Sequence, residues 1–426
     1  MDIQKKISGE QFVSREAIVL AGGLGTRLRS AVPDLPKCMA PVAARPFLYY
    51  VVNYLRMQGI EKLIFSLGYM HEVILEWLEK EFPTLNYEYV IEAEPLGTGG
   101  AIKYALQKAN TENVFIANGD TLFKFDAKAQ MARHLQNMTE CTLALKPMRH
   151  FDRYGVVTLN EQHIITSFKE KQYYDSGLIN AGLYLVNKTL FLQRSFPPKF
   201  SFEKDYLEKV VSEKVLSGII TNTYFIDIGI PEDYNVAQQH FALPGFDLSA
   251  INNEWTLFLD RDGVINHDKP GGYITTPDAF RFTEGAPELF KVLSDTFKRI
   301  IVITNQRGVG RGIIKAGDLK AMNEKMLKNV EQAGGAIDSV YFCTDAEDLS
   351  FWRKPNPGMA LQALSDFPDI DFSRSLIIGN SMSDMKFGRF TGMHTVFVTT
   401  TNKTIKLPHP DIDLVFESLQ DFVWHL

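Results

Sequence analysis

Cysteine is scarce in this chain of 426 residues, which contains only Cys38, Cys141 and Cys343. Three thiols that lie far apart and are odd in number exclude a disulfide framework in practice, so we interpret them as reduced and buried. The chain also lacks any stretch near the roughly 20 apolar residues that cross a bilayer. Its first residues, MDIQKKISGEQF, lack the apolar core of a secretory signal. These absences predict a cytoplasmic protein with no membrane partner.

Positive charge is not in excess either. The chain has 45 Lys and Arg against 51 Asp and Glu, for a net charge of −6. Nucleic-acid binding usually needs a basic face, so we expect no nucleic-acid partner, and local Lys and Arg must meet any anionic substrate. A hydrophobic fraction of 45% is typical of a globular protein, and the length exceeds one ordinary core. We therefore predict two globular domains; the oligomeric state stays open, with a homo-oligomer possible.

Short apolar runs alternate with helical patterns in both halves of the chain. The strand-like runs are 17–20, 63–67, 114–117, 142–145, 256–259, 300–303 and 376–378, and the clearest helical stretches are 47–57 and 99–108. This alternation predicts an α/β fold with mainly parallel sheets, whose ligands bind at the carboxyl ends of the strands. We predict two doubly wound domains, over residues 1–245 and 254–426, joined by a linker at 246–253.

A glycine-rich turn directly follows the first apolar run. AIVLAGGLGTRLRS spans residues 17–30, and Lys37 follows a loop bracketed by prolines. Glycine lets backbone N–H groups approach an oxyanion, but no Gly-Lys-Ser/Thr closes this turn, so it is not a Walker A loop. The combination of GGLGTRL, PK and PV resembles the sugar nucleotidyltransferases. This resemblance implies a Rossmann-like domain in which Arg27 and Lys37 act on the triphosphate. The nucleotide-binding residues that it implies here are Leu20, Ala21, Gly22, Gly23, Gly25 and Thr26.

Further segments in roughly the first 240 residues match the same family. EPLGTGGA, at 94–101, resembles its nucleobase-binding segment, whereas FKEK and LINAGLY resemble its sugar-phosphate pocket. An ionised Glu92 carboxylate could accept the two adjacent donors of guanine, although an ordinary surface charge is the alternative for this residue. The implied contacts are Glu92, Gly97 and Thr98 to the nucleotide, and Glu170, Lys171 and Asn180 to the sugar phosphate.

Two aspartates complete this first site. Either Asp120 in NGDT or Asp227 in DIGIPEDY would, taken alone, usually cap a helix or a turn. At the family's positions both imply Mg²⁺, which prefers oxygen ligands together with substrate phosphates. In the implied reaction a sugar 1-phosphate oxygen attacks the α-phosphorus of a triphosphate and expels pyrophosphate. Because two polyanions repel, the metal, Arg27, Lys37 and Lys171 must offset their charge, and no protein nucleophile is needed.

The second half opens with a different phosphate signature, TLFLDRDGVIN at 256–266. Asp260 and Asp262 follow a strand-like run, and on an extended chain residues two apart point the same way. Thr304-Asn305-Gln306, Arg353-Lys354-Pro355 and the segment IIGNSMSD, with Asn380 and Asp384, follow in order. This ordered set resembles the haloacid dehalogenase (HAD)-type phosphatases over roughly residues 254–426.

The resemblance implies a role for each motif residue. Asp260 would be the nucleophile that forms an aspartyl-phosphate, and Asp262 the general acid and base. Thr304 would bond the phosphoryl group, and Lys354 would offset its charge. Asn380 stands where the family commonly has Asp; it contributes no charge, which lowers the expected metal affinity. The implied Mg²⁺ ligands are Asp260, Asp262 through its backbone carbonyl, Asn380 and Asp384.

The spacing of these motifs leaves no room for a large cap domain. DRDGVIN and NQRGVGRG resemble the capless heptose-bisphosphate and histidinol-phosphate phosphatase subgroup. That subgroup often carries a zinc loop with several Cys and one His, but here only Cys343 lies in that region, and one cysteine cannot make a tetrahedral site. We therefore expect Mg²⁺ at both sites and no zinc. The substrate contacts implied by the subgroup are Asn305, Gln306, Arg311 and Arg353.

Together the two resemblances predict consecutive steps of one pathway. D-glycero-D-manno-heptose 1,7-bisphosphate would lose its 7-phosphate, and GMP from GTP would then join heptose 1-phosphate to give the GDP-heptose and pyrophosphate. GTP and sugar phosphates are therefore the expected partners. Three alternatives stay open: another nucleotide sugar (GDP-mannose, a UDP- or a dTDP-hexose), a histidinol-phosphate phosphatase fusion, and a sensor with one non-catalytic domain. The motif aspartates are all present, which disfavours the sensor; the anomer and any direct transfer between sites are not determined.

Overall fold

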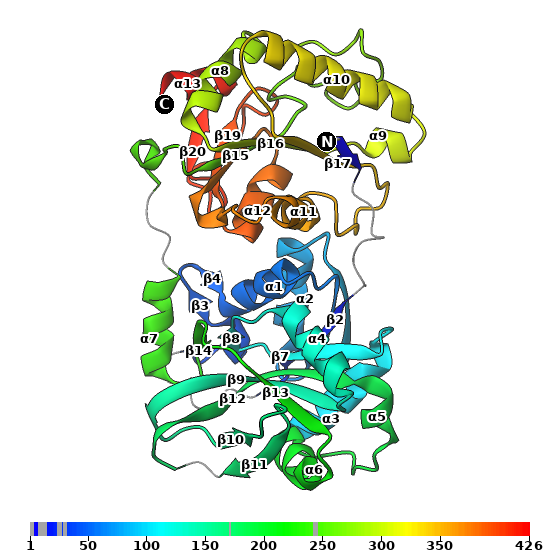
Figure 1. The fold of residues 1–426 in the computed structure, drawn as a ribbon, viewed down its shortest axis with the longest axis vertical. Coiled ribbons are helices and arrows are strands. Elements are labelled where there is room, and N and C mark those ends of the chain that lie inside the picture. The colour runs from blue at the N-terminus through cyan, green and yellow to red at the C-terminus, as the bar shows by residue number, and fades with distance from the viewer. Residues whose placement is uncertain (1–3, 7–14, 24–27, 29–31, 170–171, 242–245) are drawn as a thin grey trace. The chain divides into compact units, whose positions relative to one another are not determined.

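The computed structural model describes residues 4–6, 15–23, 28, 32–169, 172–241 and 246–426. The chain divides into two compact units, one formed by Ser14–Leu243 and the other by Met1–Val13 together with Pro244–Leu426 (Figure 1). Each unit has its own sheet and its own buried core. Each unit can therefore position a site by itself.

The first unit is centred on four parallel strands. β2 (Glu16–Ala21) lies between β5 (Lys62–Leu67) and β7 (Asn113–Asn118), and β6 (Asn86–Ile91) pairs with β5. The apolar runs that predicted the first three strands lie within them and are largely buried. The carboxyl ends of all four strands meet at one edge of the sheet, which is the edge where ligands of such sheets bind.

Antiparallel strands extend this sheet beyond β7, which differs from the mainly parallel sheet that the sequence predicted. β12 (Tyr174–Asn187) pairs antiparallel with β7, with Leu183 opposite Ala117. The pairing of β12 with β9 shifts register between Asn180 and Tyr184, which marks a β-bulge there. The other strands of this extension are β9 (Cys141–Phe151), β10 (Val156–Leu159), β11 (Ile165–Lys169) and β13 (Leu216–Ile220). Two short pairs complete the unit: β3 (Pro41–Val42) with β4 (Arg45–Pro46), and β8 (Thr121–Phe123) with β14 (Phe225–Asp227).

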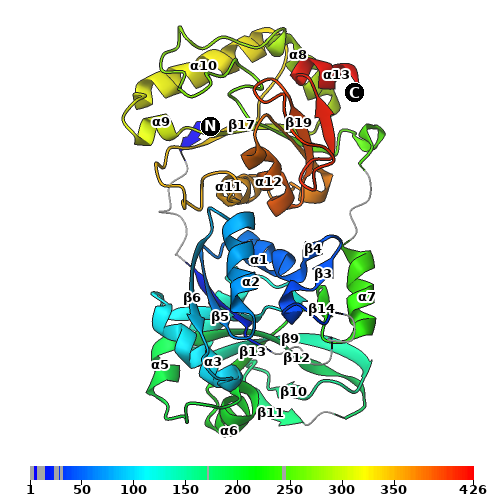
Figure 2. The same ribbon diagram turned by 180° about the vertical axis from the view of Figure 1, so that it is seen from behind.

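Helices cover both faces of this sheet. α1 (Phe47–Met57), which spans the residues predicted to be helical, lies with α2 (His71–Glu81) on one face (Figure 2). On the other face, α3 (Gly97–Ala105), α5 (Lys188–Gln193) and a π-helical turn (Phe202–Leu207) pack on a core that includes Ile18, Ile64 and Ile116. The remaining helices are α4 (Ala127–Asn137), α6 (Glu208–Val210) and α7 (Pro231–His240).

The second unit has a sheet of seven parallel strands with β15 (Thr256–Leu259) in the middle. Its order is β1, β17, β16, β15, β18, β19, β20. β15 coincides with the predicted run, and the motif residues follow it directly. The other strands are β16 (Arg299–Asn305), β17 (Ser339–Cys343), β18 (Ser375–Gly379), β19 (His394–Val398) and β20 (Leu414–Phe416).

Two helical layers enclose the second sheet. α8 (Ala286–Thr296), α10 (Ala316–Gln332) and α13 (Leu419–Trp424) contribute to the core on one face. α11 (Gly358–Asp366) and α12 (Met382–Thr391) form the core on the other face (Figures 1 and 2). α9 (Arg307–Gly310) is a single turn after β16. The predicted α/β class with two doubly wound domains is confirmed. Among the described residues, no helix combines the length and the apolar composition needed to span a bilayer.

The structure corrects the predicted domain limits at both ends of the first domain. β1 (Gln4–Lys6) pairs in parallel with β17, so the start of the chain belongs to the second unit although 1–245 was predicted as one domain. The predicted linker 246–253 also belongs to that unit, because Phe246, Leu248 and Ile251 pack against its core. Local composition did not reveal either point, since the first depends on which sheet the segment joins and the second on which core the segment packs against.

Candidate active sites

Lys37, Asp120 and Asp227 converge in the first unit. Asp120 follows β7, and the pairing of β14 with β8 sets Asp227 opposite Thr121. Lys37 Nζ lies 2.5 Å from Asp120 Oδ2 and 3.3 Å from Asp227 Oδ1. Burial lowers the pKa of Lys37, but the two carboxylates outweigh burial, so its pKa is raised. The structure thus brings together three of the predicted residues, with the ammonium between the two carboxylates.

Part of the predicted nucleotide loop is described, and it lies beside Glu92. Leu20 and Ala21 end β2, and Gly22 and Gly23 follow. A Cβ atom at Gly22 would lie 2.8 Å from Glu92 Oε1, so the carboxylate sits against the glycine turn. Ser66 Oγ donates to Glu92 Oε1 at 3.1 Å, and the Leu96 amide donates to Oε2 at 3.0 Å. These bonds orient the carboxylate. The predicted residues Gly25, Thr26 and Arg27 lie outside the described residues.

The glycines at the start of α3 pack closely against the segment that contains Pro198 and Phe200. Gly97 has φ +73°, and a Cβ there would lie 2.5 Å from the Phe200 carbonyl oxygen, so this position requires glycine. Thr98 Oγ1 donates to Glu203 Oε2 at 2.8 Å and accepts from the Phe202 amide at 2.9 Å. The hydrogen of the hydroxyl is thus used within the protein, so it cannot donate to a ligand in this arrangement. A contact of Gly97 or Thr98 with a nucleotide stays a prediction.

Asn180 lies on β12 at the register shift. Its amide Nδ2 donates to Tyr184 OH at 3.0 Å, and its Oδ1 accepts from the Gly182 amide at 3.1 Å. Because β12 pairs with β7, this bulge lies near the end of β7 that precedes Asp120. A Cβ at Gly182 would lie 2.4 Å from Asn118 Nδ2, which shows how closely the two segments approach. The predicted sugar-phosphate residues Glu170 and Lys171 lie outside the described residues.

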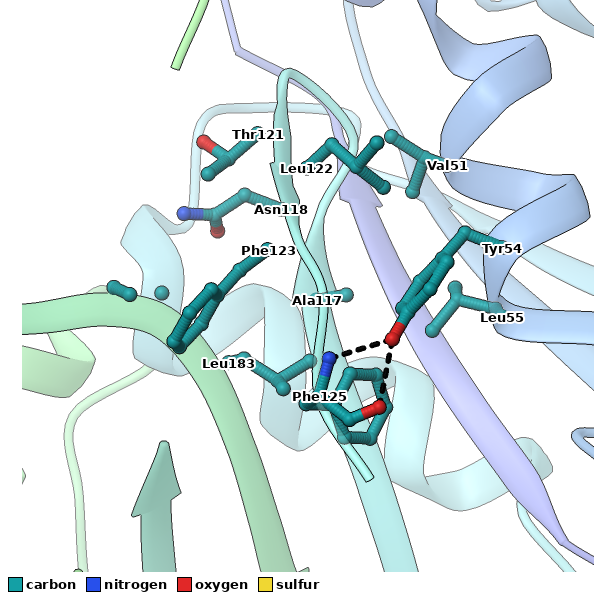
Figure 3. Close-up of a pocket in the computed structure, with 12 residues that line it drawn as sticks. Val51, Tyr54, Leu55, Ala117, Asn118, Thr121, Leu122, Phe123, Phe125 and Leu183 are labelled. Carbon is teal, nitrogen blue, oxygen red and sulfur yellow. Dashed lines mark hydrogen bonds between the residues drawn. The ribbon is translucent and has the colours of Figure 1, made fainter. Parts of the chain in front are cut away.

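A small pocket lies behind this edge, between α1 and the strands β7, β8 and β12 (Figure 3). Asn118 and Thr121, which flank the turn that carries Asp120, line it. The hydroxyl of Tyr54 donates to the Phe125 carbonyl and accepts from the Phe125 amide, both at 2.6 Å. This pair of bonds ties α1 to the chain that follows β8. The pocket is otherwise lined by apolar side chains, so we interpret it as part of the support of the site.

In the second unit, Lys354 joins two buried carboxylates. Its Nζ lies 2.8 Å from Asp260 Oδ1, 2.6 Å from Asp384 Oδ1 and 2.9 Å from the Ile303 carbonyl oxygen. The Lys354 side chain is 1% exposed and that of Asp384 is 0% exposed. Burial raises the pKa of Asp260, and Lys354 opposes that effect. The pKa of Lys354 is also raised, because Asp260 and Asp384 outweigh the effect of its burial.

Asp262 is held by a fully buried arginine. Arg261 Nη2 lies 3.0 Å from both carboxylate oxygens of Asp262, and Arg261 Nη1 donates to Asn323 Oδ1 at 2.9 Å. Gln306 Nε2 donates to Asp262 Oδ2 at 2.8 Å and to Thr304 Oγ1 at 2.9 Å. Burial would raise the pKa of Asp262, but Arg261 and the hydrogen bonds lower it overall. Thr304, Gln306 and Asp262 thus form one hydrogen-bonded group beside Asp260.

Asp260, Asp262, Thr304, Gln306, Lys354 and Asp384 line one cavity of about 290 Å³. Arg353 also lines it, and its Nη1 is buried without a hydrogen-bond partner among the described residues. A buried guanidinium nitrogen without a partner is costly unless an anion satisfies it.

Arg311 is exposed and donates to Tyr273, which lines the cavity. Asn305 is structural here, since its side chain exchanges two hydrogen bonds with the Lys354 backbone, at 3.1 and 3.0 Å. Nine of the predicted residues line the cavity: Asp260, Asp262, Thr304, Asn305, Gln306, Arg353, Lys354, Asn380 and Asp384.

The donor atoms at both sites suit a hard cation. Asn380 Nδ2 donates to Thr401 Oγ1 at 2.7 Å, which leaves the Asn380 carbonyl oxygen as the free end of its amide. Oxygen donors of this kind fit Mg²⁺, which usually keeps waters and substrate phosphates among its ligands. Within the described ranges, no three His, Cys, Asp or Glu side chains are grouped to hold a metal alone. Asn380, backbone oxygens and phosphates must therefore complete any such site.

The sequence did not single out Arg261 or Asn323. In the sequence, Arg261 is the residue between Asp260 and Asp262, and an arginine between two acidic residues is usually expected to be exposed to solvent. The structure buries it completely, with its guanidinium carbon 5.7 Å from the centre of the Phe280 ring. Asn323 lies on α10, far along the chain, and no local pattern links it to the motif. The one feature of the sequence that could have indicated a role for Arg261 is its position inside the phosphatase motif.

Two phosphate-handling sites on separate α/β units define an enzyme that combines a nucleotidyltransferase with a HAD-type phosphatase. Residues 16–242 match the family model for nucleotidyl transferases, and the chain belongs to that family. Residues 351–422 match a model described as HAD-hydrolase-like. The predicted fusion and its two reaction classes are confirmed.

Relatives of the first unit include two proteins named D-glycero-alpha-D-manno-heptose 1-phosphate guanylyltransferase. The one from Aneurinibacillus thermoaerophilus is 51% identical over 229 residues, which are 53% of this chain and 99% of that protein. The one from Campylobacter jejuni is 45% identical over 219 residues, 51% of this chain and 96% of that protein. Among solved structures, HddC from Yersinia pseudotuberculosis is 37% identical with a TM-score of 0.49, and the match covers 53% of this chain and 99% of that one.

Proposed function

We propose that this enzyme carries out two consecutive steps of nucleotide-activated heptose synthesis. The second unit removes the 7-phosphate of D-glycero-D-manno-heptose 1,7-bisphosphate. The first unit then transfers GMP from GTP to heptose 1-phosphate and releases pyrophosphate. The observation that carries the proposal is the 51% identity to a heptose 1-phosphate guanylyltransferase across 99% of that protein. The phosphatase substrate follows from chemistry, since removing one phosphate from the bisphosphate yields the substrate of the other site.

The first unit needs to bring two polyanions together without a protein nucleophile. An oxygen of the sugar 1-phosphate attacks the α-phosphorus of GTP, and the bond from the α-phosphorus to the bridging oxygen breaks to release pyrophosphate. Lys37, held between Asp120 and Asp227, supplies positive charge at the edge where these phosphates would meet. Glu92 lies beside the glycine turn with its carboxylate held by Ser66 and Leu96, and in this proposal it would accept from the guanine edge.

The second unit has a nucleophile and a proton-transfer group in one cavity. Lys354 holds Asp260 Oδ1, so we assign Oδ2 to the attack on phosphorus, which forms an aspartyl-phosphate as the sugar oxygen leaves with a proton from Asp262. Water then cleaves the aspartyl-phosphate, gives a proton to Asp262 and restores Asp260 with release of phosphate. Arg261 lowers the pKa of Asp262 and so favours its ionised form, which suits the step in which Asp262 takes a proton from water. In the first step, the negative charge of the incoming phosphate raises the affinity of Asp262 for the proton that it gives to the sugar oxygen. Arg353 Nη1 is available for a substrate oxyanion.

Mg²⁺ would supply charge neutralisation for the phosphates at both sites when bound. Asp120 and Asp227 would hold it in the first unit. In the second unit the ligands would be Asp260, Asp384 and Asn380, with the Asp262 backbone carbonyl. Lys37 and Lys354 hold these carboxylates close together in the structure.

A product analysis tests the proposal. The full chain is incubated with heptose 1,7-bisphosphate, Mg²⁺ and each nucleoside triphosphate separately, and the products are identified by mass spectrometry. We expect phosphate release with every triphosphate, but a nucleotide sugar and pyrophosphate only with GTP. Efficient turnover of mannose 1-phosphate together with failure to use the heptose phosphates would refute the assignment of the sugar.

A further inference from the structure

Glu203 gathers three hydrogen-bond donors in the first unit. It lies in the π-helical turn Phe202–Leu207 on the face of the sheet that carries α3. Thr98 Oγ1 and Ser201 Oγ donate to its Oε2 at 2.8 and 3.0 Å, and Tyr184 OH donates to its Oε1 at 3.4 Å. An ionised carboxylate can accept all three, because it has only acceptor sites.

One side of this group fixes the start of α3. The Thr98 hydroxyl also accepts from the Phe202 amide at 2.9 Å, and the Gly99 amide donates to the Phe200 carbonyl at 3.0 Å. Gly97 lies against the Phe200 carbonyl as well. The turn that begins α3, which follows Glu92 in the chain, is therefore held by the segment that contains Glu203.

The other side fixes Asn180. Tyr184 is 2% exposed, and its ring packs edge-on to Phe202 with centroids 4.9 Å apart. Its hydroxyl donates to Glu203 and accepts from Asn180 Nδ2, so the orientation of the Asn180 amide depends on the tyrosine. Gly182, with φ +76°, returns a hydrogen bond to Asn180 Oδ1. The bulge on β12 is thus held through Tyr184.

We propose that Glu203 is a positioning residue that couples the nucleotide and sugar-phosphate halves of the first site. It does so through Thr98 on one side and through Tyr184 and Asn180 on the other. The inference rests on the proposed function, in which the start of α3 contacts the nucleotide and Asn180 the sugar phosphate. One carboxylate that bonds to both halves makes the geometry of each depend on the other, and only an acceptor without hydrogens satisfies every donor.

Glu203→Gln in the full chain tests this role. The variant keeps the size of the side chain but sets an N–H group against a hydroxyl donor. We expect kcat/KM to fall about tenfold for GTP and for the sugar 1-phosphate alike, mainly through the two KM values. Thr98→Val should act mainly on the KM for GTP, and Tyr184→Phe mainly on the KM for the sugar. Glu208→Gln, at an exposed position on the adjacent α6, is the matched control and should change neither.

Double variants distinguish coupling between the two halves of the site from a general loss of structure. If both halves depend on Glu203, adding Thr98→Val or Tyr184→Phe to Glu203→Gln should change either KM by less than about twofold. The proposal would be overturned if Thr98→Val or Tyr184→Phe changed the KM values in the Glu203→Gln background by the same factors as in the wild-type enzyme. It would also be overturned if Glu203→Gln changed the KM for only one of the two substrates. Thermal unfolding of each variant is measured in parallel, and a loss of activity that merely follows the loss of folded protein also counts against it. The assay uses whichever sugar 1-phosphate and triphosphate the wild-type enzyme turns over, so a wrong sugar refutes the proposed function without deciding this test.

Discussion

Replacing Lys354 by Met removes the ammonium that lies between Asp260 and Asp384 while keeping most of the side-chain volume. With Lys354 1% exposed and Asp384 0% exposed, two carboxylates would be left in a poorly solvated place. Removing one partner of such a buried pair typically costs about 3–5 kcal/mol of unfolding free energy. We expect a loss of that size in the second unit, together with loss of phosphatase activity.

The loss should depend on pH, and its sign follows from linkage. Burial already raises the pKa of Asp260, and Lys354 opposes that effect, so its removal raises the pKa further. A carboxylate with a higher pKa in the folded state than in the unfolded state takes up a proton on folding, so its contribution to stability falls as pH rises between those two values. Lys354→Met should therefore be most destabilising near pH 8 and less so near pH 5.

Urea unfolding followed by tryptophan fluorescence measures this effect. Trp255, Trp352 and Trp424 lie in the second unit, so a Trp77→Phe background restricts the signal to that unit. Lys291→Met is the matched control, because Lys291 is 65% exposed and its nitrogen is 3.9 Å from Asp295. It should change the unfolding free energy by less than about 0.5 kcal/mol. Pyrophosphate release by the first unit should survive in both variants.

Two results would refute the reasoning about Lys354. One is a destabilisation below about 1 kcal/mol at pH 8, which would mean that the carboxylates are well solvated without the ammonium. The other is an equal loss at pH 8 and pH 5, which would assign the effect to packing rather than to charge.

Four further outcomes are expected. Asp260→Asn should abolish phosphate release and leave pyrophosphate formation from GTP and a sugar 1-phosphate nearly intact, whereas Asp120→Ala should do the reverse; one folded variant that loses both activities would contradict the two-site model. Asp413→Asn should destabilise the second unit by about 2 kcal/mol at pH 7, because the pKa of Asp413, despite its burial, is lowered from 3.8 to about 2 by His394, Arg389 and hydrogen bonding. A carboxylate with a depressed pKa loses its contribution to the unfolding free energy as pH falls from about 4 towards 2. In urea unfolding, the difference in unfolding free energy between wild type and Asp413→Asn should therefore shrink over that pH range. A difference that stays constant would contradict this assignment. Glu92→Gln should weaken the use of GTP far more than binding of the sugar 1-phosphate, and an unchanged preference over ATP and UTP would move base recognition elsewhere. Chelation should stop phosphate release and Mg²⁺ alone should restore it, with stoichiometric zinc in elemental analysis as the contrary result.

The predictions that hold best rest on contiguous sequence. The run TLFL predicts β15 because a β-branched threonine and three apolar residues before a polar motif have few alternatives to a buried strand. The helix over residues 47–57 follows from its apolar periodicity in the same way. The phosphatase motifs also come together as expected. Three of them lie at the carboxyl ends of β15, β16 and β18, Lys354 lies in the chain that follows β17, and the carboxyl ends of such parallel strands share an edge.

Other features depend on pairing between segments that are distant in the sequence. Asp120 meets Asp227 because β14 pairs with β8, and no local pattern encodes that register. β1 belongs to the second unit because its backbone adds to the edge of β17.

The burial of particular polar side chains was likewise decided by the tertiary structure. The sequence by itself determined the two reaction classes and the half of the chain in which each lies. Only the tertiary structure decided that Arg261 is buried against Asp262 and Asn323, and that Glu203 receives hydrogen bonds from Thr98 and Tyr184. A charged residue reads as solvent-exposed until its partners are known, and here the partners come from other strands and helices.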